Sequence, residues 1–391
     1  MSLPGATPSV RASAAIVGAA DAVSPTGELG GSVRGWEVAM AREALADAGL
    51  ALSDVDGIFS CTGGTLMHSV ELAEYLGIQP RWTDSTNTGG SAFEVHVEHA
   101  AAAIHAGLCD VALVVYAGLP RSSRGGIGAL VTGPRAEWEL PYGILLPTGA
   151  YALAASRHMA QYGTRAEHLA QIAVSTREWA ALNPRARLQK PLTLDEAMSS
   201  PVIASPLRKI DCCLVTDGAG AIVMTSAERA RDLRRPPIYV LGAATSHSHS
   251  SIMQMPDLTE TCGVESGSRA FAMAGVQPAD VDVAELYDSF TITVLLALED
   301  LGFCKKGEGG EFVASGALDP GGALPAQTSG GGLCYTHPGM FGIFLLVEAV
   351  RQLRGECGPR QVEGARVAVA HGCGGVLSAT STVVLGTGET L

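Results

Sequence analysis

Short apolar runs alternate with longer amphipathic stretches along this chain, and glycine-rich turns separate them. The apolar runs predict buried strands at residues 14–18, 57–60, 111–116, 238–242, 283–286 and 366–370. Helical periodicity predicts helices at residues 36–48, 92–107, 151–162, 165–182, 266–274 and 342–353. Strands that alternate with helices favour an α/β protein whose sheets are buried under helices on both faces.

One pattern of nine residues occurs twice. AGLALSDVD at residues 48–56 matches AGVQPADVD at residues 274–282, and each copy stands between a predicted helix and a predicted strand. We therefore predict two duplicated halves, residues 1–235 and residues 236–391. The surplus length of the first half lies at about residues 119–205, where turns rich in Gly, Pro and Arg alternate with amphipathic helices. This stretch is predicted to be an inserted cap.

Composition and charge indicate a folded protein and argue against nucleic-acid binding and membrane insertion. Of the 391 residues, 47% are hydrophobic and 17% are charged, which predicts a folded protein too large for one ordinary core. The net charge of −13 and the lack of a basic run argue against nucleic acid as a partner. The apolar runs are far shorter than the ~18 residues of a membrane span, and the amino terminus has no leader pattern. We expect a cytoplasmic protein that does not contact membranes, with its nine cysteines as reduced thiols.

Five short motifs stand out against this background. They read SPLRKIDCCLVTDGAGA, TNTGGSAF, ELYDSF, GGLCYTHPG and AHGCGGVLS, at residues 205–221, 86–93, 285–290, 331–339 and 370–378. Together with the repeat they resemble the thiolase superfamily, in particular the sterol-carrier-protein-type thiolases and the lipid-transfer-protein-type aldolases of steroid side-chain degradation. The resemblance covers nearly the whole chain. It implies a thiolase-like fold, in which two duplicated βαβαβαββ halves form a layered α-β-α-β-α core.

The first chemical motif lacks the nucleophile that the resemblance implies. A thiolase has a cysteine at a helix N-terminus, where the helix dipole lowers the pKa of the thiol. The matching stretch here contains Gly89, Gly90 and Ser91 and no cysteine. We expect these three residues to contact the substrate or its CoA, and Ser91 to act as a helix cap rather than a nucleophile. Without a thiol here, the acyl-enzyme intermediate is lost.

Two tyrosines fall on the next two motifs. Tyr287 and Asp288 stand where the family has Asn-Glu or His-Asp, and Tyr335 precedes a Gly-His-Pro-like segment in which Thr336 replaces the glycine. A phenol can donate a proton to a developing anion, or accept one if its neighbours lower its pKa of ~10. The resemblance to the thiolase-like aldolases implies that such a pair carries out retro-aldol cleavage.

The remaining motif residues receive their roles from the resemblance. It implies that His337 binds the thioester oxygen, and that His371 or Cys373 takes the place of the second thiolase cysteine. Both registers stay open. Gly374 and Gly375 are expected to contact the substrate or CoA. We interpret Cys212 and Cys213 as buried packing residues, and we expect no metal site at His247 and His249, because no further ligand has suitable spacing.

The sequence thus predicts a carbon–carbon lyase that cleaves a β-hydroxyacyl-CoA, with a steroid or a similar bulky group, to a ketone or aldehyde and a shorter acyl-CoA. The substrate class and a small OB-fold partner protein are implied by the resemblance. So is a homodimer, formed through the strand at residues 111–116 and the helix that follows Gly89. CoA is expected as part of the substrate, with no other cofactor. Two alternatives stay open: an acyltransferase that uses Cys334 or Cys373, and a non-catalytic subunit of a complex.

Overall fold

The fold is that of a computed structural model, which describes residues 10–62, 65–124, 134–144 and 147–391. Its main sheet contains nine strands in the order β3-β2-β4-β7-β1-β8-β11-β10-β9, and β5 pairs with β6 in a separate small sheet. The strands are β1 (Ala14–Ala22), β2 (Gly57–Phe59), β3 (Trp82–Asp84), β4 (Val111–Gly118), β5 (Val202–Ala204), β6 (Leu207–Arg208), β7 (Gly218–Ser226), β8 (Ile238–His247), β9 (Val283–Leu286), β10 (Val367–Gly374) and β11 (Ala379–Gly386). Every residue of β4, β9, β10 and β11 is buried, as the apolar runs predict for the first three; β11 was not predicted.

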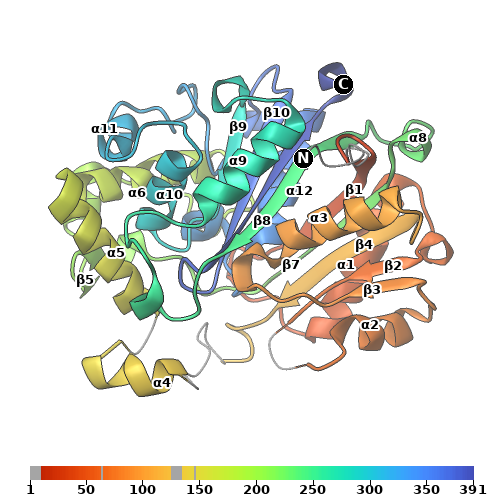
Figure 1. The fold of residues 1–391 in the computed structure, drawn as a ribbon, viewed down its shortest axis with the longest axis horizontal. Coiled ribbons are helices and arrows are strands. Elements are labelled where there is room, and N and C mark those ends of the chain that lie inside the picture. Colours follow the sequence, from red (N-terminus) through yellow and green to blue (C-terminus); the bar gives the residue numbers. More distant parts are fainter. Residues whose placement is uncertain (1–9, 63–64, 125–133, 145–146) are drawn as a thin grey trace, which may run out of the picture.

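The helices cover the sheet in layers (Figure 1). They are α1 (Val33–Ala48), α2 (His68–Leu76), α3 (Ala92–His105), α4 (Pro134–Trp138), α5 (Pro147–Tyr162), α6 (Ala166–Ala181), α7 (Leu194–Met198), α8 (Ala227–Ala230), α9 (Gly263–Ala274), α10 (Thr291–Asp300), α11 (Gly309–Ala314) and α12 (Gly342–Arg354). Helices α3 and α12 contact each other and strands of both halves, whereas α1 packs on β1, β4 and β7, and α9 packs on β8 and β11. The result is an α-β-α-β-α arrangement, with the two halves of the sheet joined through β1 and β8.

The two copies of the sequence repeat build the same local structure. Helix α1 ends at Gly49 and helix α9 ends at Gly275, with φ angles of 75° and 66°, a left-handed conformation that glycine adopts without steric cost. The last aspartate of each copy then fixes a neighbouring strand. Asp56 accepts hydrogen bonds from the N–H groups of residues 110 and 111, and Asp282 from those of residues 366 and 367.

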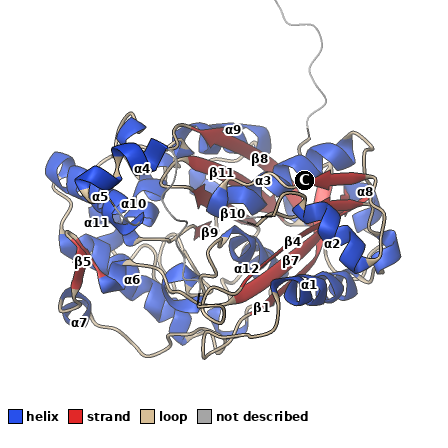
Figure 2. Cartoon of the chain, turned by 90° about the horizontal axis from the view of Figure 1, so that it is seen from below, coloured by secondary structure: helices blue, strands red, loops and turns tan. Residues whose placement is uncertain are grey.

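The predicted cap contains α4 to α7 and β5, and its residues 125–133 and 145–146 lie outside the described part of the chain. Helix α5 packs on α10, and α6 packs on α10, on α11 and on a π-helical turn at Gly331–Tyr335. Figure 2 shows these helices gathered at one end of the molecule, beside α10 and α11. The boundary between the two predicted halves stays a prediction.

Strand β4 lies between β2 and β7 and is hydrogen-bonded to both. The prediction that two copies join their sheets through residues 111–116 is therefore wrong, because the backbone groups on both sides of this strand are already paired. The free edge of the first half is β3. In the described residues, no helix combines the length and the apolar character that crossing a bilayer requires.

Candidate active site

A cavity of about 770 Å³ lies where the cap meets the motif segments. Helix α5, the segment before β7, the turn after β9, the π-helical turn and the ends of α3 and β10 all contribute residues to it. Its walls are mostly apolar, with the large side chains Leu188, Ile203, Ile210, Leu214, Val215, Phe290 and Leu333. Arg177 and Lys209 are its basic residues. Such a cavity suits a bulky apolar ligand that carries anionic groups at one end.

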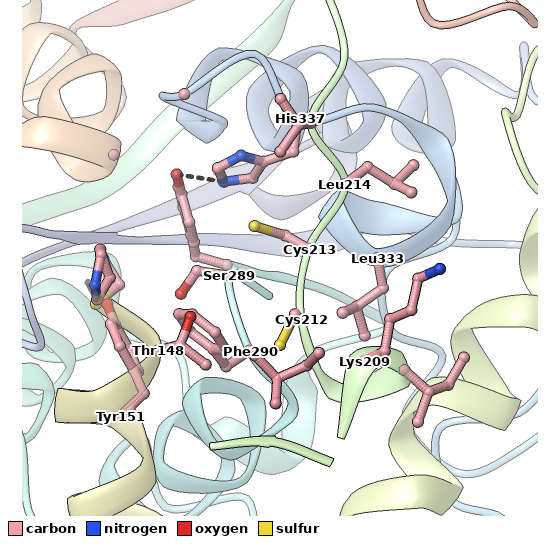
Figure 3. A pocket seen from close by; sticks show the side chains of 18 of the residues that line it. Thr148, Tyr151, Lys209, Cys212, Cys213, Leu214, Ser289, Phe290, Leu333 and His337 are labelled. Carbon is pink, nitrogen blue, oxygen red and sulfur yellow. Dashed lines mark hydrogen bonds between the residues drawn. The ribbon is translucent and has the colours of Figure 1, made fainter. Parts of the chain in front are cut away.

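Tyr287 and His337 meet at the wall of this cavity, and a dashed line at the labelled His337 marks their hydrogen bond in Figure 3. The Tyr287 hydroxyl lies 3.1 Å from His337 Nε2, and it accepts a hydrogen bond of 3.1 Å from the N–H of Phe341. Burial raises the pKa of Tyr287 well above its usual value and lowers the pKa of His337 to about 4. Both side chains are therefore neutral at pH 7. In the tautomer of His337 that carries its proton on Nδ1, Nε2 accepts the proton of the phenol.

Gly90 explains why no nucleophile stands at the start of α3. A Cβ atom on Gly90 would lie 2.5 Å from two carbons of the Tyr287 ring and would overlap the carbonyl oxygen of Cys373. The space that a nucleophilic side chain would need is therefore filled by the ring of Tyr287. Gly89 and Gly90 line the cavity. Ser91 is buried behind them, with its hydroxyl 3.0 Å from that of Thr88, and its side chain caps no backbone N–H of α3.

Asp288 is buried and fixes the π-helical turn instead of lining the cavity. Its carboxylate accepts hydrogen bonds from the N–H groups of Gly332 at 2.6 Å and Leu333 at 3.0 Å. Burial nevertheless raises its pKa to about 7. Leu333 and His337 line the cavity on either side of the end of this turn, so Asp288 positions the segment that carries them.

Tyr335 lies on the same turn but is not among the residues that line the cavity. Its hydroxyl donates a hydrogen bond to Asp21, whose carboxylate also pairs with Arg185 at 2.7 Å and with Arg351 at 2.6 Å. These two guanidinium groups hold the pKa of Asp21 far below its usual range although its burial opposes this. The structure therefore does not bring the phenols of Tyr287 and Tyr335 to one cavity.

Only some residues of the last motif, residues 370–378, line the cavity. Cys373 and Gly375 line the cavity, whereas His371 is not among the residues that line it and shares a hydrogen bond of 2.9 Å with Thr382. Gly374 allows close packing, because a Cβ atom there would overlap the carbonyl oxygen of residue 88. Of the two registers, the structure thus brings Cys373 and not His371 to the site.

Three cysteines line the cavity: Cys212, Cys213 and Cys373. The interpretation of Cys212 and Cys213 as packing residues alone is therefore wrong, because the chain turns both toward the cavity. Burial raises the pKa of Cys212 and of Cys373 to about 12, and that of Cys213 still further. Cys334 lies behind the wall, where Arg177 Nε donates to its sulfur at 3.1 Å, and its pKa is about 11. All four are protonated thiols at pH 7, which are poor nucleophiles.

Comparison with known proteins places this geometry in a family. The family model described as Thiolase C-terminal domain-like matches residues 244–387. The 17-hydroxy-3-oxo-4-pregnene-20-carboxyl-CoA lyase of Mycobacterium tuberculosis is 40% identical over 331 residues, which cover 80% of this chain and 84% of that protein. An acetyl-CoA acetyltransferase of Methanothermobacter thermautotrophicus is 35% identical over 346 residues, or 85% of this chain and 88% of that protein. This chain belongs to the thiolase superfamily.

A solved structure in the superfamily supports the same assignment. The structure titled Ltp2-ChsH2(DUF35) aldolase has a TM-score of 0.89 and 33% sequence identity, and the match covers 97% of this chain and 98% of that one. The predicted thiolase-like fold is thereby confirmed. Similarity to both a lyase and an acetyltransferase means that membership of the thiolase superfamily does not by itself choose the reaction. That choice rests on the cavity.

Sequence reasoning missed several cavity residues of this thiolase-superfamily chain, among them Arg177, Lys209 and Tyr151. Tyr151 of α5 is buried and lines the cavity, and its ring lies 4.3 Å from that of Phe290. The sequence places it correctly on a cap helix but offers no motif that assigns it a role. In the described part of the chain, no group of three or more His, Cys, Asp or Glu side chains is arranged to hold a metal ion.

Proposed function

We propose that this protein is a carbon–carbon lyase that cleaves a β-hydroxyacyl-CoA by a retro-aldol reaction. One observation carries this proposal: the ring of Tyr287, whose hydroxyl is bonded to His337, lies against Gly90, in the stretch that the resemblance matches to the thiolase nucleophile, and the cysteines of the cavity are protonated. A retro-aldol reaction needs proton transfer and stabilisation of an enolate, and it needs no covalent acyl-enzyme.

We further propose that the acyl group is a steroid or has a similar bulky apolar skeleton. The apolar walls and the volume of about 770 Å³ support this substrate class. The substrate in the name of the mycobacterial relative fits the chemistry, because its hydroxyl is on C17 and its thioester is attached to C20, which makes the hydroxyl β to the thioester. Cleavage between C17 and C20 of such a compound would give a 17-ketone and propanoyl-CoA.

The proposed proton acceptor is the Tyr287–His337 pair. The β-hydroxyl gives its proton to the Tyr287 oxygen while the Tyr287 proton passes to Nε2 of His337 across 3.1 Å. The Cα–Cβ bond then breaks, the β-carbon becomes a carbonyl, and the electron pair enters the thioester enolate. This step requires a neutral imidazole whose Nε2 carries no proton, and the lowered pKa of His337 keeps the ring neutral at pH 7.

The other predicted site residues receive narrower roles in this proposal. Gly89, Gly90 and Gly375 contact the acyl-CoA, because they line the cavity and leave room for it. Ser91 and Gly374 shape the walls from behind. Asp288 and Tyr335 are positioning residues that hold the π-helical turn. Arg177 and Lys209 supply positive charge for the CoA phosphates.

The acyltransferase remains the second candidate, because an acetyl-CoA acetyltransferase is among the similar proteins and Cys373 lines the cavity. It requires a thiolate at neutral pH, whereas the pKa of Cys373 is raised to about 12. The absence of a cationic partner beside the Cys373 thiol, in the part of the chain that the structure describes, counts further against it.

We also propose a cytoplasmic homodimer that acts with a small OB-fold partner. The nine free cysteines suit a reducing compartment.

The exposed edge strand β3, with Trp82 at its start and Tyr75 on the adjacent α2, offers a surface for a second copy. The name of the similar aldolase structure joins Ltp2 to ChsH2(DUF35), which supports a partner protein. Light scattering should give about 80 kDa, twice the 40.1 kDa of one chain, and a 40 kDa particle would contradict the dimer.

The lyase proposal is tested by product analysis. Purified protein, alone and with a candidate partner, is incubated with 17-hydroxy-3-oxo-4-pregnene-20-carboxyl-CoA, and the products are separated and weighed by mass spectrometry. We expect equal amounts of the 17-ketone and propanoyl-CoA, and a loss of both with Tyr287→Phe. Transfer of the acyl group to free CoA or to a protein thiol, without cleavage between C17 and C20, would contradict the proposal.

A further inference from the structure

The cavity contains a second phenol that the motifs do not predict. Tyr151 reaches it from the cap helix α5, and Figure 3 shows its side chain beside Phe290 and Thr148. Only 3% of Tyr151 is exposed, so its hydroxyl is shielded from bulk water and open to a ligand in the cavity. The packing of its ring against that of Phe290, with the two ring planes tilted by 32°, holds it in this direction.

The hydroxyl of Tyr151 is surrounded by polar groups of the cavity wall. It donates to the carbonyl oxygen of Gly375 at 3.5 Å, whereas O–H···O hydrogen bonds are normally 2.5–3.0 Å long. The hydroxyl of Ser289, the thiol of Cys373 and the backbone of Leu377 also interact with it. A proton in such a long hydrogen bond can be redirected to a bound substrate at little cost in free energy.

The location of Tyr151 differs from that of the Tyr287–His337 pair. Its partner Cys373 is near the end of β10 and its partner Gly375 directly follows that strand, whereas His337 follows the π-helical turn. A ligand in the cavity would therefore meet two phenols: Tyr287, which follows β9, and Tyr151, which belongs to the cap helix α5. A retro-aldol reaction needs two proton transfers at different atoms, one from the β-hydroxyl and one to the α-carbon.

We propose that Tyr151 is a catalytic residue that donates the proton to Cα of the thioester enolate. This inference rests on the proposed lyase function. The enolate carbon takes the proton of the Tyr151 hydroxyl and forms a C–H bond, which leaves a phenolate on Tyr151 and the shortened acyl-CoA as product. The proton that His337 gained from Tyr287 passes to the Tyr151 phenolate as the products leave, so both groups are neutral again and no net charge is left. Burial raises the pKa of Tyr151 well above its usual value, which keeps the proton on the phenol until the enolate forms.

The same step run backwards gives a direct assay. A protein that protonates Cα must also remove a Cα proton from the product, so wild-type protein should exchange the Cα hydrogens of propanoyl-CoA for deuterium in D2O. Tyr151→Phe keeps the ring against Phe290 and removes only the hydroxyl; it should lose about 10²-fold or more of the exchange rate, the usual scale for acid–base catalysis. Tyr287→Phe should lose cleavage of the β-hydroxyacyl-CoA while it retains exchange. Tyr142→Phe, at an exposed tyrosine of the cap, is the control and should change neither rate.

The outcomes separate the two proposals. Wild-type protein that neither cleaves nor exchanges contradicts the lyase function itself. If the wild type cleaves and Tyr151→Phe matches it in both assays, Tyr151 is not the donor. Loss of exchange in Cys373→Ala with Tyr151→Phe unaffected would assign the step to the thiol and overturn the inference. Thermal melting and the Kd for propanoyl-CoA, both unchanged in Tyr151→Phe, would show that the loss is chemical and not structural.

Discussion

Glu94 should make the protein lose stability as the pH rises from 5 to 7. This residue lies in the first turn of α3, is fully buried, and has no hydrogen-bond partner for either carboxylate oxygen in the described residues. The side chain fits only because Gly342 and Gly372 face it, since a Cβ atom on either glycine would overlap Oε2. Burial raises the pKa of Glu94 from 4.5 to about 8, so the folded protein keeps this proton through pH 7.

The size of the effect follows from the two pKa values. The unfolded chain releases the proton above pH 4.5 and the folded chain only near pH 8, so the folded state binds more protons between these values and loses stability as pH rises. One proton changes the free energy of unfolding by about 1.4 kcal/mol per pH unit, which gives about 2.5 kcal/mol between pH 5 and pH 7. Glu94→Gln removes the titration.

Urea unfolding of the wild type and of Glu94→Gln at both pH values measures this change. Other buried carboxyl groups, such as Asp288, titrate in both proteins, so the difference between the two pH dependences isolates Glu94. We expect the wild type to lose about 2.5 kcal/mol more than the variant between pH 5 and pH 7. Glu43→Gln, at an exposed position of α1, serves as the control and should follow the wild type. Equal pH dependences for the wild type and Glu94→Gln would refute the reasoning, because Glu94 would then titrate alike in both states.

Three further substitutions test the geometry of the site. Tyr287→Phe should lower kcat by about 10²-fold and cost about 1–3 kcal/mol of stability, because it removes the hydroxyl bonded to His337 and leaves the buried N–H of Phe341 without its acceptor; wild-type kcat in a steady-state assay would contradict this. Gly90→Ala should destabilise the protein by about 1–3 kcal/mol in thermal denaturation and lower turnover, because the new Cβ meets the Tyr287 ring; an unchanged melting temperature would show that the space is not filled. Tyr335→Phe should cost about 1.5–3 kcal/mol of stability through the lost bond to Asp21 and lower kcat less than Tyr287→Phe does; an equal loss of kcat with an intact fold would mean that Tyr335 reaches the substrate.

The fold could be predicted in outline because its signals are local. Alternating apolar and amphipathic segments place the strands, and β9 falls where the apolar run predicts it. The repeat predicts equivalent turns because Gly49 and Gly275 each end a helix in a left-handed conformation. The position of β4 inside the sheet could not be predicted this way, because strand order depends on pairing between segments far apart in the chain.

The sequence predicted those site residues that lie in short local motifs, and it did not predict those whose contacts are distant in the chain. The glycines at 89 and 90 indicate the missing nucleophile, and Tyr287 follows directly from its strand. The direction of Tyr335 depends on a π-helical turn and on Asp21, which is 314 residues away in sequence. Tyr151 comes from the inserted cap and meets Gly375 across 224 residues. No local pattern carries such contacts, so the second phenol of the cavity emerged only from the structure.

The claim that this thiolase-superfamily protein works without a covalent intermediate is tested most directly by its mass during turnover. Intact-mass spectrometry is carried out on protein quenched during cleavage of 17-hydroxy-3-oxo-4-pregnene-20-carboxyl-CoA, with the products quantified in the same samples. The account predicts unmodified protein throughout, while the 17-ketone and propanoyl-CoA accumulate in equal amounts. Protein carrying an acyl group on Cys373 or another cysteine, formed and discharged at the rate of turnover, would contradict it and establish an acyltransferase.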